Sequence, residues 1–68
     1  MKAFTLYFYS QNGSCITYFG VDGKSKARVL RMGREIAQIM LDYYKSGGMP
    51  WLTKITVKAE EYKSNLKQ

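Results

Sequence analysis

The residues in this 68-residue chain that could carry out chemistry are one thiol, five carboxylates and a short glycine–lysine–serine segment. Cys15 is the only cysteine, and the chain has no histidine that could activate its thiol as a nucleophile. These counts also exclude an intrachain disulfide and remove the commonest ligands of zinc. A lone thiol is typical of a reducing compartment, so we expect a cytoplasmic protein in which Cys15 is a small core residue.

The carboxylates do not predict an acid–base pair. Glu35 and Asp42 fall on the polar side of a predicted helix, three or four residues from an arginine or a lysine. This spacing is typical of ion pairs on a helix surface. Because the sequence contains neither a catalytic pair nor a cluster of ligands, we expect no enzymatic activity, no cofactor and no metal site.

Gly23-Lys24-Ser25 is similar to the end of a phosphate-binding loop, but that motif needs a glycine where Tyr18 stands. A weaker prediction remains, because the free N–H groups at the start of a helix attract anions. Lys24 and Lys26 add cations there, where the helix dipole disfavours them. We therefore interpret Lys24, Ser25 and Lys26 as a candidate anion contact, and a solvated basic turn is the alternative.

The charge of the chain is strongly positive, with a formal net charge of +6 and a pI near 9.6. Such a charge favours an anionic partner, although it also serves solubility. No run approaches the roughly 20 apolar residues that cross a membrane. Residues 1–6 are too short and too alternating for a signal peptide, so we expect no membrane association.

Two strands and a hairpin are predicted at the start of the chain. Residues 3–9 alternate in polarity, and Asn12-Gly13 is a strong turn signal before a return strand at residues 14–21. A two-residue loop pairs Phe8 with Thr17, whereas a three-residue loop would shift the pairing by one. On the two-residue register, the apolar face carries Phe4, Leu6, Phe8, Cys15, Phe19 and Val21. The opposite face carries Thr5, Tyr7, Tyr9, Ile16 and Tyr18.

Residues 24–46 have the apolar period of an amphipathic helix. Asp22 or Ser25 would cap its start and Gly47 its end in the left-handed conformation. Gly33 lies in the apolar arc, which indicates a close neighbour such as Phe8 or Trp51. A third strand is predicted over residues 51–59, with Trp51, Ile55 and Val57 turned inward, followed by a polar tail at 60–68.

These elements predict one α+β domain over residues 1–68, in the order ββαβ, with the helix on one face of a three-stranded sheet. The first strand is the most apolar, so we expect it in the middle, in strand order 2-1-3. Order 1-2-3 is the alternative.

The aromatic face of the predicted sheet is the main candidate for binding. Tyr7, Tyr9 and Tyr18 project there, and the third strand adds Lys54 and Lys58. Tyrosine-rich surfaces favour protein interfaces, and aromatic rings beside lysines also suit single-stranded DNA or RNA. We rank a protein partner first, and we extend the predicted site to a cationic stripe on the helix that consists of Arg28, Arg31 and Arg34.

The apolar arc of the predicted helix spans roughly 200°, which is more than a three-stranded sheet covers. Met32, Ile39 and Tyr43 lie at one edge of the arc. Their position predicts cover by the tail, by a partner, or by a second copy in a homodimer.

In size and layout, the chain resembles small proteins of phages and mobile elements, including some anti-CRISPR and anti-restriction inhibitors. The resemblance implies a non-enzymatic inhibitor or adaptor that occupies a surface of a nucleic-acid-handling complex. The alternatives are a direct binder of single-stranded DNA or RNA and a structural homodimer.

Overall fold

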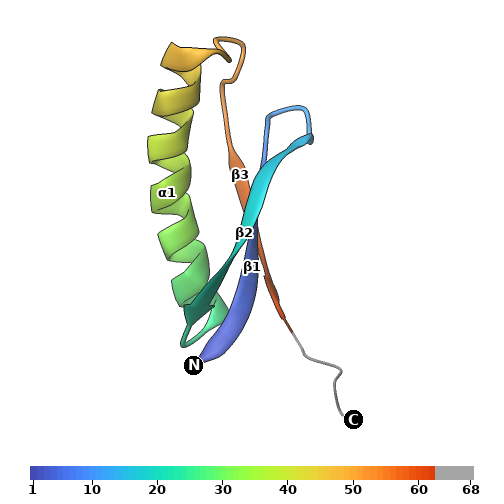
Figure 1. The fold of residues 1–68 in the computed structure, drawn as a ribbon, viewed down its shortest axis with the longest axis vertical. Coiled ribbons are helices and arrows are strands. Elements are labelled where there is room, and N and C mark those ends of the chain that lie inside the picture. Colours follow the sequence, from blue (N-terminus) through green and yellow to red (C-terminus); the bar gives the residue numbers. More distant parts are fainter. Residues whose placement is uncertain (63–68) are drawn as a thin grey trace.

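The computed structural model describes residues 1–62 and has the predicted α+β fold (Figure 1). Its elements are β1 (Lys2–Tyr9), β2 (Cys15–Gly23), α1 (Lys26–Gly47) and β3 (Thr56–Glu61). The strands form one antiparallel sheet in the order β2-β1-β3, which confirms the predicted order. The most apolar strand is therefore the central one, as burial on one face and pairing on both edges require.

The hairpin between β1 and β2 combines the two registers considered above. The Ser10 N–H donates to the Ser14 carbonyl oxygen at 2.8 Å and closes a three-residue loop, in which Gly13 has a φ of 86°. Tyr9 consequently pairs with Cys15. Ile16 then forms a β-bulge, and from Phe8 onward the pairing follows the two-residue register, as predicted.

The bulge corrects the prediction for Cys15. This residue is exposed rather than buried, because its pairing with Tyr9 puts it on the face opposite the helix. Phe8, Leu6 and Phe4 keep their predicted inward positions because the bulge has already absorbed the extra residue.

Helix α1 packs on the sheet through Val29, Gly33 and Ala37, which lie four residues apart. A Cβ at Gly33 would lie 2.8 Å from Val57 Cγ1 and 3.1 Å from Leu6 Cδ2. Gly33 therefore lets the helix approach the sheet closely, as predicted, and the side chains nearest to it are Val57 and Leu6 rather than Phe8 or Trp51. Within residues 1–62, no helix has the length and apolar character needed to cross a membrane.

The two ends of α1 differ in how well they were predicted. Ser25 is the N-cap, since its hydroxyl accepts the Arg28 N–H at 3.3 Å. The predicted left-handed cap at Gly47 is wrong, because the helix includes Gly47 and Gly13 is the only described glycine with positive φ. The chain instead leaves the helix at Gly48, whose N–H donates to the Tyr44 carbonyl oxygen.

The segment between α1 and β3 departs most from the prediction. The strand begins at Thr56 rather than residue 51, and Trp51 is 51% exposed while Leu52 is fully buried. The Gln11 side chain fixes this segment, because its amide donates to the Trp51 carbonyl oxygen at 2.8 Å and accepts the Thr53 N–H at 3.1 Å. Two bonds to the hairpin loop thus replace the strand pairing that was predicted here.

The C-terminal tail was predicted to begin at residue 60. Glu60 and Glu61 instead belong to β3, and the Tyr62 N–H donates to the Ala3 carbonyl oxygen at 2.8 Å. The rest of the predicted tail, residues 63–68, lies outside the described part of the chain.

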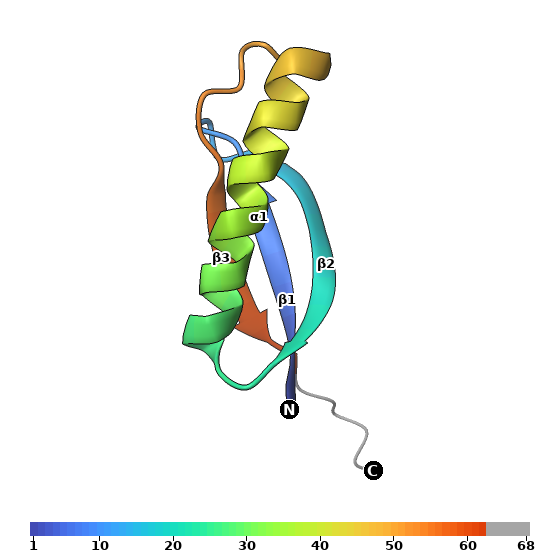
Figure 2. The ribbon, with the colours of Figure 1, turned by 90° about the vertical axis from the view of Figure 1, so that its left-hand side faces the viewer.

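One layer of the fold covers the other only in part. Figure 2 shows α1 in front of β3 and β1, with β2 beside the helix. A helix is about 10 Å wide and neighbouring strands are about 4.8 Å apart, so one helix covers about two strands. The inner face of β2 is therefore incompletely covered, and Phe19 remains 37% exposed although it stacks on Phe8 at 5.3 Å.

We expect Gly33→Ala to lower the free energy of unfolding by about 1–2 kcal/mol, because the steric clash with Val57 and Leu6 exceeds the helix propensity that alanine adds. Gly47→Ala is the matched control, since no atom lies within 4 Å of its Cβ position. Urea unfolding measures both variants. A Gly33→Ala variant as stable as Gly47→Ala would contradict the close helix–sheet contact.

We expect Gln11→Ala to lower the free energy of unfolding by about 1 kcal/mol and to change the emission of the single tryptophan, Trp51, by freeing its segment. Gln11→Glu keeps the acceptor for the Thr53 N–H but turns a carboxylate oxygen toward the Trp51 carbonyl. It should therefore show the same changes as Gln11→Ala. Unchanged tryptophan emission in both variants would show that these bonds do not hold the segment.

Candidate functional site

The open face of the sheet carries three tyrosines in ring-to-ring contact, and we call Tyr7, Tyr9 and Tyr18 the tyrosine face. The Tyr7 and Tyr9 rings are stacked, with centroids 6.3 Å apart and planes at 19°. The Tyr7 and Tyr18 centroids are 5.8 Å apart. The contacts follow from the strands, because Tyr7 and Tyr9 are two residues apart on β1 and the register pairs Tyr7 with Tyr18.

The tyrosine face lies on the side of the sheet opposite α1, since Phe4, Leu6 and Phe8 of the same strand face the helix. Tyr7 and Tyr9 are half-buried by their neighbours, and Tyr18 on the edge strand is 65% exposed. A cluster of this kind offers flat aromatic surface with hydroxyl groups at its rim.

Charges near the tyrosine face are few and mixed. Lys58 pairs with Tyr7 across β1 and β3, so it lies on this face as predicted. Glu60 pairs with Thr5 on the same face, and its carboxylate lies 3.9 Å from the Lys58 ammonium. Asp22, which pairs with Ala3, adds a second carboxylate. The tyrosine face is therefore not a cationic surface.

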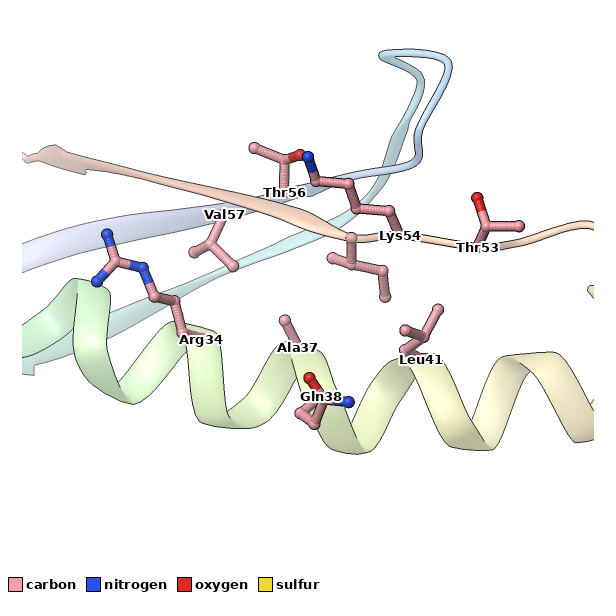
Figure 3. Close-up of a pocket in the computed structure, with 9 residues that line it drawn as sticks. Arg34, Ala37, Gln38, Leu41, Thr53, Lys54, Thr56 and Val57 are labelled. Atoms are coloured by element: carbon pink, nitrogen blue, oxygen red, sulfur yellow. The ribbon is translucent and has the colours of Figure 1, made fainter.

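Lys54 was predicted on the tyrosine face but precedes β3 and lines an open cleft of about 480 Å³ between this segment and α1. Figure 3 shows Ala37 and Leu41 of the helix and Val57 of β3 pointing into the space between helix and strand. Arg34 and Lys54 also line this cleft. Lys54 lies two residues before the start of β3, so no strand pairing fixes it on the tyrosine face, and Figure 3 shows its side chain pointing away from the helix, on the same side of the strand as Thr56.

The cationic stripe of Arg28, Arg31 and Arg34 is exposed on α1, as the helical period predicts. The helix covers the inner face of the sheet, and the tyrosine face is the outer one. The structure therefore places the stripe and the tyrosines on opposite layers, and it does not bring the two halves of the predicted site together.

At the candidate anion contact at the start of α1, Ser25 already makes hydrogen bonds within the helix. The Ser25 hydroxyl accepts the Arg28 N–H and the Ser25 carbonyl oxygen accepts the Val29 N–H, so this residue serves the helix itself. Lys24 and Lys26 are exposed beside it. The structure thus shows an ordinary N-cap with two exposed lysines beside it, and the anion contact stays a prediction.

The residues predicted to pair two copies are exposed to different degrees. Ile39 and Tyr43 are 70% and 71% exposed, and Met32 is 37% exposed. At 100° per residue, the three lie within roughly 40° of one another on the helix. Met32 also lines a pocket with Asp22 and Gly23 at the end of β2, so this apolar stripe lies on the β2 side of α1.

Comparison of this chain with protein-family models, curated proteins and solved structures finds no match in any of the three. Within residues 1–62, no three side chains of histidine, cysteine, aspartate or glutamate are grouped as a metal site.

We expect Cys15 to react with a thiol reagent in the native protein within about threefold of its rate in denaturant, because its side chain is exposed beside Tyr9. Absorbance with a chromogenic disulfide measures both rates. Native labelling slower by two or more orders of magnitude would place the thiol in the core and contradict the bulge at Ile16.

Proposed function

We propose that the protein is a non-enzymatic binding module that acts by docking its tyrosine face against another protein. The observation that carries this proposal is the cluster of Tyr7, Tyr9 and Tyr18 on a sheet face that the helix leaves open. Tyrosine is among the residues most enriched at the energetic centre of protein interfaces. Strand positions also hold the rings in place, so little side-chain entropy is lost on binding.

The charges around the tyrosine face favour a protein over a nucleic acid. A platform for single-stranded DNA or RNA combines stacked rings with cations that meet the phosphates. Here Lys58 is already close to Glu60, Asp22 adds another negative charge, and Lys54 precedes β3 and has no place in the strand register. Direct binding of single-stranded nucleic acid is therefore the second candidate, supported by the rings but not by their surroundings.

The positive charge of α1 favours a negatively charged partner. Helix α1 alone carries five lysines and arginines against two carboxylates. A positive surface of this kind speeds association with negatively charged partners. Together with the resemblance to small inhibitors, this charge supports a target within a nucleic-acid-handling complex, where the module would act as an inhibitor or adaptor.

We expect a tagged protein to capture its target from a nuclease-treated lysate of its own cells, and Tyr18→Ala to weaken capture at least tenfold, as the loss of a hot-spot tyrosine does. Tyr43→Ala is the matched control, because this tyrosine is as exposed as Tyr18 but lies on α1. The target should also protect Cys15 from labelling, since the thiol lies beside Tyr9.

Equal effects of Tyr18→Ala and Tyr43→Ala, or a Cys15 that stays reactive in the complex, would contradict docking through the tyrosine face.

Fluorescence anisotropy with short labelled DNA and RNA tests the second candidate. Stacking predicts that Tyr7→Ala weakens binding about tenfold with little change in salt dependence, whereas Lys58→Ala flattens the salt dependence. Salt-sensitive binding that ignores Tyr7 would reflect net charge alone.

A further inference from the structure

Strand β2 is an edge of the sheet, and its outward backbone groups can be assigned from one hydrogen bond. The Ala3 carbonyl oxygen accepts the Tyr62 N–H on the β3 side of β1. Backbone groups alternate in direction along a strand, so those of Phe4 and Leu6 point toward β2. On β2 itself, the groups of Phe19 and Val21 therefore point toward β1. Those of Tyr18 and Gly20 point outward, where residues 1–62 provide no further strand.

From Thr17 onward, beyond the bulge at Ile16, this edge has little of the usual protection against pairing with another strand. Exposed edges are normally blocked by charged side chains, by proline or by very short strands. Strand β2 is nine residues long, and Asp22, near its end, is its only charged residue. The other edge strand, β3, is six residues long and carries Lys58, Glu60 and Glu61. The two edges of the sheet thus differ sharply in their capacity to accept a partner.

Aromatic side chains are exposed on both faces of β2. Tyr18 is exposed on the outer face, and Phe19 is partly exposed on the inner face, which α1 covers only in part. A strand that adds to this edge would therefore cover apolar surface on both sides of the sheet as well as satisfy the outward backbone groups.

We propose that a second copy of this chain occupies the β2 edge, so that two β2 strands pair antiparallel about a two-fold axis at Phe19. Outward groups must meet outward groups, and this register joins Tyr18 of each copy to Gly20 of the other by backbone hydrogen bonds. Phe19 then lies directly opposite Phe19 of the second copy on the inner face. The result is a continuous six-stranded sheet.

Two features of the strand favour a second copy over a different protein. The first is self-complementarity, because Gly20 has no side chain and leaves the space that the Tyr18 ring of the other copy needs. The second is charge. In a chain with a net charge of +6, two copies repel each other through most of their surfaces, but residues 15–21 carry no charge. Isologous contact is therefore least opposed along this edge.

The proposed dimer would also join the two tyrosine faces into one surface, with Tyr18 of each copy near its centre. This consequence rests on the proposed function, but the pairing of the β2 strands does not. Dimerisation and target capture can therefore fail separately, and a monomeric variant can still be assayed for capture.

Chemical cross-linking tests the register directly. In a Cys15→Ser background, Phe19→Cys puts two thiols opposite each other at a pair whose Cα atoms are about 4.5 Å apart, within the range that a disulfide spans. Mild oxidation should convert most of this variant into a covalent dimer. Gln38→Cys in the same background is the control, because this residue is exposed on α1 but lines the cleft on the β3 side, and it should remain mostly monomeric.

Sedimentation equilibrium from 5 to 200 micromolar tests the association itself, with circular dichroism confirming that each variant is folded. We expect the wild-type protein to dimerise, and Phe19→Lys to raise the dissociation constant at least tenfold because like charges would face each other across the axis. Gln38→Lys adds the same charge on the β3 side of α1, away from the β2 edge, and should change it less than twofold. A wild-type monomer at 200 micromolar, or a dimer that Phe19→Lys disrupts no more than Gln38→Lys does, would overturn the proposal.

Discussion

The close packing of α1 on the sheet at Gly33 is the contact on which the rest of this small domain depends. With one helix available for three strands, the core forms where the helix approaches most closely, against Leu6 of β1 and Val57 of β3. The same contact leaves the inner face of β2 partly uncovered. A domain of this size buries only a small core. Because the described part of the chain has one helix, β3 is covered by that helix, whereas β2 at the other edge is covered only in part.

Much of the fold could be predicted from the sequence because its signals are local and agree with one another. Alternation in residues 3–9, the turn at Asn12-Gly13 and the helical period of residues 24–46 together predict the pairing of β1 with β2 and the central place of β1. What failed was set by longer-range interactions. Alternation of polarity from Trp51 onward looks the same in a paired strand and in an extended segment, and the Gln11 bonds that decide between them join residues about 40 positions apart.

The candidate site was predicted in part for the same reason. Strand alternation and register bring together four of the predicted residues, Tyr7, Tyr9, Tyr18 and Lys58. Both signals are local enough to be predicted from the sequence. Cys15 moved to their face through a bulge at Ile16, and no single residue type marks a bulge of this kind. The arginines of α1 were grouped with the tyrosines by charge and composition alone. Charge does not indicate which side of a sheet a helix covers. The structure places the arginines and the tyrosines on opposite layers, so that grouping was wrong.

The separation of the cationic stripe from the tyrosine face bears on the proposed function. A single site built from tyrosines and arginines would contact one mixed surface of a partner, whereas in the proposed function the cationic helix would guide approach and the aromatic face would provide the contact. Charges on a helix attract a partner over a distance of about one Debye length. Aromatic rings stabilise a complex only at direct contact, once water has been excluded. In the proposed dimer, residues 15–21 of β2, which carry no charge, would let a second strand extend the aromatic face along this edge.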